Sequence, residues 1–221
     1  MINIKKLKSS ELDSAIYAMI LGDGCIQKSN SKNGNCNLKI GHSIKQTEYL
    51  LWKKSIIDQI GSVKTRYWNY EKQNAVYIET NARIYFTKLE KLFYDNRKKN
   101  INSKILNKLT TLSLAIWFMD DGYISYNKSG SPYGELCTDQ LPLEQVKLIQ
   151  QWFFKKFKMT VGIRELKYLT GKQKGTIAYR IKFNKENCSK LSNIIFPYVN
   201  QIECMKYKLY KQASLEEEKS S

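Results

Sequence analysis

The stretch Ile16-Tyr-Ala-Met-Ile-Leu-Gly-Asp23-Gly24 sets the architecture of this chain, together with its partner Leu114-Ala-Ile-Trp-Phe-Met-Asp-Asp121-Gly122. Each is an apolar run typical of a buried helix, and each delivers an aspartate and a glycine where that helix should stop. The negative end of a helix dipole disfavours another negative charge, so a cation is expected beside both aspartates. An Asp-Gly pair is also an ordinary helix stop, but two copies in matching contexts favour a functional site.

Two carboxylates that lie within a few Å of each other cannot both stay ionised at neutral pH without a compensating charge. A hard divalent ion bound by oxygen ligands supplies that charge, and Mg2+ is the common choice beside phosphates. If the two helix ends meet, Asp23 and Asp121 therefore predict a Mg2+ site for phosphodiester chemistry, with Mn2+ as an alternative ion.

The net charge indicates a polyanionic partner. The chain has 221 residues, of which 37 are basic and 20 acidic, and the formal charge is +17. The basic residues are interleaved with Tyr and Trp, which favours nucleic acid over the two alternatives, a merely basic soluble protein and a membrane-surface binder. Apolar residues make up 42% of the chain, enough for a core, and no run is long enough to cross a membrane. We expect an intracellular protein without a membrane partner.

The cysteines and the histidine of the chain limit the kinds of metal site and catalytic centre that it can form. Five cysteines lie far apart, in odd number and without a Cys-x-x-Cys pair, so neither a disulfide framework nor a zinc site is predicted. His42 is the single histidine, so a nuclease centre built from several histidines is excluded. Catalysis is expected to depend on carboxylates and lysines.

The first half of the chain has the pattern helix, hairpin, helix, hairpin, helix. Its motif helix is expected over 11–22, begun by Ser10 and Asp13 as a capping pair. Hydrophobic periodicity and turn residues predict the later segments. These are a polar loop over 27–37, a strand over 37–43, a helix over 46–60, strands over 62–70 and 75–80, and a helix over 81–95.

The second half repeats this order. Asp121 follows Asp23 by 98 positions (121 minus 23), and most later elements keep roughly that offset, which indicates an internal duplication. After the second motif helix, the expected segments are a loop over 125–134, a strand over 135–139, a helix over 142–157, strands over 161–168 and 176–183, and a helix over 185–196. We therefore predict an N-terminal half over 1–99, a linker over 100–110, a C-terminal half over 111–212 and a disordered acidic tail over 213–221.

The two motifs resemble those of LAGLIDADG homing endonucleases in the single-chain form, which carries both copies. Aligned on the closing Asp-Gly, the catalytic acidic position of the family falls on Asp23 and Asp121. The small-residue positions of the motif are Ala18 and Gly22 in the first copy but Ile116 and Asp120 in the second. The bulky Ile116 predicts motif helices that pack asymmetrically or slightly apart.

We predict an α/β (α+β) fold of two pseudo-two-fold αββαββα units. The motif helices pack at its centre, over antiparallel sheets that form a saddle for DNA. A sheet can lie in the major groove of duplex DNA, and a pair of sheets would follow a long site. Basic and polar residues on the strands are the candidate DNA contacts. They are Lys39, Ser43, Arg66, Arg164, Lys167, Arg180 and Lys182.

The resemblance also assigns residues at the cleavage centre. A lysine in each half lies near the scissile phosphate in the family, which places Lys99, with Lys98 as the near alternative, and Lys208 in that role. A compact cation suits the negative charge of the pentavalent phosphate. The backbone carbonyls of Gly22 and Asp120 are the further metal ligands that the family implies.

The resemblance implies a monomeric, intron-encoded enzyme that makes a staggered double-strand break in a long, non-palindromic DNA site. The alternative is an intron maturase, an RNA-binding splicing cofactor on the same fold. A DNA-binding regulator on an inactive nuclease scaffold is a third class, marked by loss of one acidic residue. Because Asp23 and Asp121 are both present, cleavage is favoured. Abundant Lys, Asn, Ile and Tyr indicate an AT-rich genome, compatible with an organelle, a phage or a bacterium.

Overall fold

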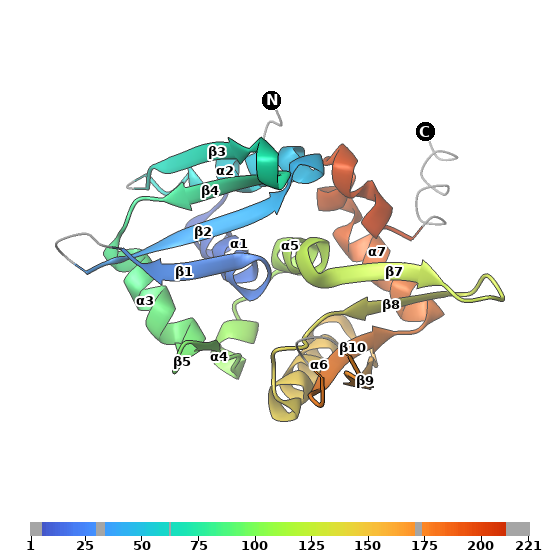
Figure 1. Ribbon diagram of the computed structural model, residues 1–221. Coiled ribbons are helices and arrows are strands. Elements are labelled where there is room, and N and C mark those ends of the chain that lie inside the picture. Colours follow the sequence, from blue (N-terminus) through green and yellow to red (C-terminus); the bar gives the residue numbers. More distant parts are fainter. Residues whose placement is uncertain (1–5, 30–33, 62, 171–173, 211–221) are drawn as a thin grey trace.

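Two copies of one element order, helix, hairpin, helix, hairpin, helix, lie on either side of a central helix pair (Figure 1). The computed structural model describes residues 6–29, 34–61, 63–170 and 174–210. The predicted acidic tail over 213–221 lies outside the described residues. The predicted αββαββα duplication is confirmed.

The elements of the first half follow in chain order. They are α1 (Ser9–Leu21), β1 (Gly24–Lys28), β2 (Cys36–Ser43), the 3-10 helix η1 (Ile44–Gln46), α2 (Thr47–Ile57), β3 (Thr65–Tyr70), η2 (Glu71–Gln73), β4 (Ala75–Thr80) and α3 (Ile84–Phe93). The short pair β5 (Tyr94–Asp95) and β6 (Lys98–Lys99) and the helix α4 (Ser103–Leu106) lead to the second half. The predicted linker therefore contains a helical turn.

The second half repeats the pattern. Its elements are α5 (Thr111–Asp121), β7 (Gly122–Tyr126), β8 (Pro132–Leu136), α6 (Leu143–Phe157), β9 (Gly162–Lys167), β10 (Ile177–Phe183), α7 (Lys185–Val199) and η3 (Glu203–Lys208). Thr110 begins α5 with a capping box, in which its side chain accepts from the Ser113 N–H and the Ser113 hydroxyl accepts from the Thr110 N–H.

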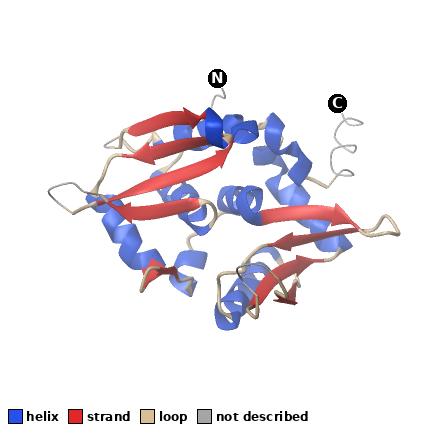
Figure 2. Cartoon of the chain, in the orientation of Figure 1, coloured by secondary structure: helices blue, strands red, loops and turns tan. Residues whose placement is uncertain are grey.

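Each half builds a four-stranded antiparallel sheet. The strand orders are β1-β2-β4-β3 and β7-β8-β10-β9, so the two sheets have the same topology. Buried and partly exposed residues alternate along β4, as expected for a strand covered on one face. Helices α2 and α3 cover the first sheet, and α6 and α7 cover the second (Figure 2). Within the part of the chain that the structure describes, the other face of each sheet carries no helix.

The central pair α1 and α5 places the motifs. The two helices lie side by side, and β1 and β7 leave their C-terminal ends in opposite directions (Figure 1). A Cβ added at Gly24 would overlap the Met19 carbonyl, and one added at Gly122 would overlap the Phe118 ring. The motif glycine is therefore required in both copies, because the chain turns back tightly over the last helical turn.

Three local predictions were wrong. Helix α1 begins at Ser9, capped by the Glu11 side chain, which accepts from the Lys8 N–H at 3.0 Å, so Ser10 and Asp13 are not the capping pair. The predicted loop over 125–134 is shorter, because Tyr126 pairs with Pro132 across a turn. The predicted strand over 135–139 ends at Leu136, which pairs with Gly122 at the start of β7. The Cys137 N–H donates to the Asp121 carbonyl at 2.9 Å, but Asp121 is already part of helix α5.

Among the described residues, none of the helices combines the length and the apolar composition that a membrane crossing requires.

Candidate active site at the seam of the two motif helices

The motif helices touch at both ends. Near their N-terminal ends, the buried hydroxyls of Ser14 and Ser113 share a hydrogen bond. Near their C-terminal ends, Gly22 packs against Asp120, and a Cβ added at Gly22 would overlap the Asp120 carboxylate. The C-terminal contact is asymmetric, because a glycine on one helix faces an aspartate on the other, while Ile116 is fully buried between these ends.

Asp23 and Asp121 both lie at the seam formed by the ends of α1 and α5. Asp121 is the last residue of α5, and Asp23 follows the C-cap residue of α1. Burial, then Asp120, then Asp23 raise the pKa of Asp121 from 3.8 to about 7. Burial and then Asp120 also raise the pKa of Asp23, against the lowering effect of nearby lysines. The seam therefore holds carboxylates that disfavour one another's ionisation.

The two predicted lysines reach this seam from opposite halves. The Lys99 Nζ donates to the Gly22 carbonyl at 2.6 Å and to the Leu21 carbonyl at 3.3 Å. The Lys208 Nζ donates to the Gly122 carbonyl at 2.5 Å. Burial lowers the pKa of both lysines, and the seam carboxylates oppose that shift. The cations expected at the negative helix ends are thus present, and Lys99 rather than the exposed Lys98 provides one of them.

A third lysine, Lys53, lies beneath the seam and was not predicted. Its side chain and that of Asp120 are fully buried, with Nζ 2.6 Å from Asp120 Oδ1. The same Nζ lies 3.1 Å from His42 Nε2 and 4.4 Å from the centre of the Tyr49 ring. Lys53 occurs on the apolar face of α2 at helical spacing from Tyr49, Ile56 and Ile57. A lysine within such a stripe was the available sequence signal.

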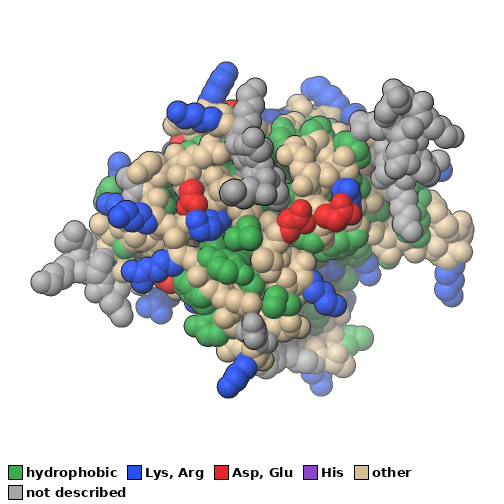
Figure 3. Space-filling model, turned by 90° about the horizontal axis from the view of Figure 1, so that it is seen from above, with side chains coloured by type: hydrophobic (Ala, Val, Ile, Leu, Met, Phe, Trp, Pro, Cys, Tyr) green, Lys and Arg blue, Asp and Glu red, His purple; other side chains and the backbone are tan. Residues whose placement is uncertain are grey.

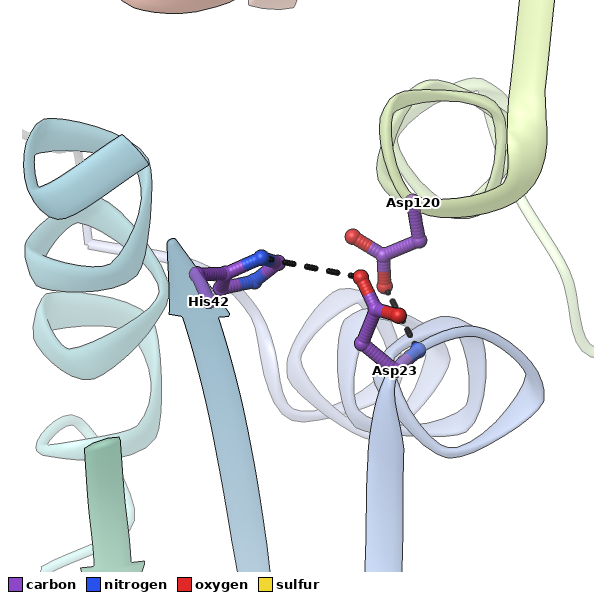
Figure 4. Close-up of side chains that lie close together, drawn as sticks. All are labelled: Asp23, His42 and Asp120. Carbon is purple, nitrogen blue, oxygen red and sulfur yellow. Dashed lines mark hydrogen bonds and ion pairs between the residues drawn. The ribbon is translucent and has the colours of Figure 1, made fainter. Parts of the chain in front are cut away.

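His42, the single histidine, is directed at Asp23. Its Nδ1 lies 3.6 Å from Asp23 Oδ2, and the Asp23 backbone N–H donates to Asp120 Oδ2 at 3.1 Å (Figure 4). Burial and then Lys53 lower the pKa of His42 to about 3, so the ring is neutral and its contact with Asp23 is dipolar rather than ionic.

Asp23, His42 and Asp120 have the residue types of a metal triad, with ligand atoms within 4.8 Å of one another. Lys53 argues against that use. An ammonium only donates hydrogen bonds, so His42 Nε2 accepts from it and Nδ1 carries the ring hydrogen, with no lone pair left for a metal. Lys53 already supplies the positive charge at this point.

The carboxylates that fit a divalent cation are Asp23 and Asp121. The Asp23 side chain is 39% exposed, and hard oxygen donors with raised pKa values are the donor set that Mg2+ or Mn2+ favours. Of the predicted carbonyl ligands, Gly22 accepts from Lys99, so a metal there would share or displace that lysine. The side-chain carboxylate of Asp120, as distinct from its predicted backbone carbonyl, already accepts from Lys53, from the Asp23 N–H and from the Tyr49 hydroxyl at 2.8 Å.

A pocket opens beside Asp121 on the surface of the seam. Lys99, Trp117, Asp121 and Asp139 are among the residues that line it. The pocket thus brings one seam aspartate and one seam lysine to the same hollow.

The open sheet faces carry most of the predicted DNA contacts. On the first sheet, Lys39 and Arg66 lie across Glu79 on the same face, with Ser43 further along that face. The Lys39 Nζ lies 5.7 Å from the centre of the Trp68 ring and 5.2 Å from that of Tyr77, so this face combines positive charge with aromatic rings.

The second sheet presents arginines that are already paired. Arg180 donates to both Asp139 oxygens at 2.6 Å, and Arg164 donates to the buried Glu135 at 2.6 Å. Lys182 is exposed on this face, opposite Glu135. By strand alternation Lys167 points to the helix-covered face, so the structure does not group it with Arg164. The sequence analysis did not predict that Glu135 and Asp139 would pair with these arginines.

Figure 3 shows the molecule from above the view of Figure 1. Lys and Arg side chains are spread around its edge, with apolar patches between them and a few acidic side chains (Figure 3).

The chain is similar in sequence and in structure to known proteins. The sequence model of the LAGLIDADG DNA endonuclease family matches residues 14–191. The homing endonuclease I-WcaI, solved bound to its DNA recognition sequence, is 26% identical, with a TM-score of 0.71 over 91% of this chain and 87% of its own. The cytochrome b mRNA maturase bI2 of Debaryomyces hansenii is 28% identical over 216 residues, covering 94% of this chain and 77% of the maturase.

A third similarity covers only part of a relative. Protein RecA of Mycobacterium gastri is 25% identical over 215 residues, which are 92% of this chain but 48% of that protein. The chain thus spans about half the length of this relative.

Proposed function

The chain belongs to the LAGLIDADG DNA endonuclease family, and from that premise we propose that it is a site-specific homing endonuclease. It would make a staggered double-strand break in a long duplex site. The observation that supports this proposal is that Asp23 and Asp121 follow or end the two packed motif helices, with the Lys99 and Lys208 ammonium groups bonded to carbonyls of the same helix ends. Since the two halves are in one chain and differ in sequence, a monomer would serve and its site need not be palindromic.

Asp23 and Asp121 would hold divalent cations, with the carbonyls of Gly22 and Asp120 as further ligands. When bound, Mg2+ or Mn2+ would neutralise phosphate charge and lower the pKa of an attacking water. The product balance is one water consumed for each phosphodiester hydrolysed, one in each strand.

The protein's own cations have a separate role. The Lys99 and Lys208 ammonium groups would attract the scissile phosphates and stabilise the added negative charge of the transition state. Their burial favours this role, because a partly desolvated ammonium interacts more strongly with a phosphate than one in bulk water does.

The open sheet faces would bind the DNA arms on either side of the cut. Lys39, Arg66 and Lys182, on those faces, would contact phosphates, which give affinity but little sequence information. Arg164 and Arg180 are held in orientation by Glu135 and Asp139. They would read base edges in the major groove with the N–H groups that these carboxylates leave over.

The test is incubation with a library of duplex DNA sites and Mg2+, comparing wild type with Asp23→Asn and Asp121→Asn. Asp58→Asn is the matched control, since Asp58 lies at the surface and pairs with Lys54. Specific cutting by wild type and control, lost in both seam variants while DNA binding persists, supports the nuclease. Equal cutting by either seam variant would contradict it.

A second candidate function is supported by the maturase similarity, which covers 94% of this chain. On this reading the basic surface binds the intron RNA that encodes the protein. A wild type that cuts no duplex in the library but accelerates splicing of its intron would establish the maturase function instead. The two seam aspartates would then be dispensable for activity.

A further inference from the structure

A buried ion pair directly beneath Asp23 has no role in the chemistry described so far. Lys53 and Asp120 have fully buried side chains, and their charged atoms lie 2.6 Å apart. Asp120 Oδ1 also accepts from the Tyr49 hydroxyl at 2.8 Å. Burying two charges is costly, and such a pair often stabilises a protein no better than apolar residues of the same size. Its presence under the seam therefore calls for a reason other than stability.

Two arms connect this pair to Asp23. In the first, Asp120 Oδ2 accepts from the Asp23 backbone N–H at 3.1 Å, which fixes the main chain at the point where α1 ends. In the second, Lys53 donates to His42 Nε2 at 3.1 Å. Because the lysine has no acceptor, it selects the tautomer with hydrogen on Nδ1, and this N–H faces the Asp23 carboxylate at 3.6 Å (Figure 4).

The arrangement serves only one of the two catalytic carboxylates among the described residues. The β1–β2 register pairs Gly24 with Ile40 and the β7–β8 register pairs Gly122 with Leu136, so Thr138 takes the place of His42 in the second half. The Thr138 hydroxyl donates to the Tyr179 carbonyl and not to Asp121. Asp121 has different neighbours, with Trp117 donating to it and Lys99 attracting it. Different sets of residues therefore hold Asp23 and Asp121 at the seam.

We propose that Lys53, Asp120 and His42 are positioning residues that hold the main chain and carboxylate of Asp23 in place for DNA cleavage. This inference rests on the proposed endonuclease function. Groups that orient a ligand or catalytic residue without touching substrate commonly change activity by roughly 10- to 100-fold when removed. The effect arises because a carboxylate held in one orientation needs no reorganisation when the cation and phosphate arrive.

The first test is made on the metal-free protein and needs no activity. Since the chain has one histidine, its ring 15N resonances are unambiguous. The expected wild-type spectrum is that of the Nδ1–H tautomer. In Lys53→Met the lysine donor is lost, so the ring should shift toward the Nε2–H tautomer. An Nε2–H ring in the wild type, or a spectrum unchanged in the variant, would overturn the proposal.

The second test is single-turnover cleavage by the double variant Lys53→Met/Asp120→Asn, which removes both charges and leaves neither unpaired. Its matched control is Lys54→Met/Asp58→Asn, which removes an exposed pair from the same helix. We expect the first to cut roughly 10- to 100-fold more slowly with unchanged DNA affinity and thermal stability near wild type, and the control to cut at the wild-type rate.

The outcomes separate the two proposals. A wild type that cuts no duplex refutes the endonuclease function. A wild type that cuts, with a folded double variant that cuts equally fast, refutes the positioning role alone. If the double variant does not fold, Tyr49→Phe replaces it, because it deletes one donor to Asp120 without unpairing a charge. Cutting by Tyr49→Phe at the full wild-type rate would then count against the network.

Discussion

Replacing Asp121 by asparagine should stabilise the metal-free protein while abolishing its cleavage. Burial and the neighbouring carboxylates of Asp120 and Asp23 raise the pKa of Asp121 from 3.8 to about 7. At 1.36 kcal/mol for each pKa unit, that rise corresponds to an unfavourable free energy of about 4 kcal/mol when Asp121 is ionised. Asparagine has nearly the same shape and can still accept from Trp117, so Asp121→Asn should gain about 2 to 4 kcal/mol at pH 8.

The sign of the pH dependence follows from the raised pKa. Because Asp121 binds its proton more tightly in the folded state, its contribution to stability is complete below about pH 4 and is lost as the pH rises through 7. Asparagine does not titrate, so the advantage of the variant should be largest at pH 8 and about half as large or less at pH 5. Divalent cations should reduce the difference in stability between Asp121→Asn and wild type at pH 8, because they bind the folded wild type.

The assay is thermal and urea unfolding in EDTA at pH 5 and pH 8. For a chain of this length, a gain of about 3 kcal/mol raises Tm by roughly 6 to 12 °C. Asp95→Asn is the control, since it removes a carboxylate from an exposed position on β5. An Asp121→Asn variant that is no more stable than wild type at pH 8, or whose advantage does not grow with pH, would refute the electrostatic description of the seam.

Three further predictions concern the lysines, the helix contact and the DNA surface. Lys99→Met should slow single-turnover cleavage by on the order of 100-fold with little change in DNA affinity; an unchanged rate would remove Lys99 from the catalytic set. Gly22→Ala should lower the free energy of unfolding by about 1 to 3 kcal/mol in urea titrations, because the added Cβ overlaps Asp120. In the control Gly61→Ala, the added Cβ meets no atom within 4 Å, so the free energy of unfolding should change by less than about 0.5 kcal/mol. Lys182→Ala should weaken DNA binding and reduce the slope of log K against log salt concentration by about one. The control Lys147→Ala, on α6, should leave that slope unchanged. Equal slopes for the two variants would count against the open face of the second sheet as the DNA-binding surface.

The duplicated fold was predictable because it depends on local patterns. Apolar periodicity located the helices and strands, and the bounds of β4 match the prediction over 75–80. Where prediction failed at the end of an element, a hydrogen bond that the hydrophobic pattern does not show was responsible. The strand predicted over 135–139 ends early because Cys137 bonds to the end of α5, and Lys8 rather than Ser10 precedes α1 because Glu11 folds back on it.

The amino-acid sequence was sufficient to single out Asp23 and Asp121, because each carries its own local signal, a carboxylate and a glycine after an apolar helix. It gave no sign that Asp120 would meet Lys53 and His42, which lie 67 and 78 positions away (120 minus 53 and 120 minus 42). That meeting depends on how α1, α2, β2 and α5 pack together. The pKa and the hydrogen-bond partners of a charged side chain change when packing removes water from it and brings another charged group close. The spacing of residues along the chain shows neither of these effects.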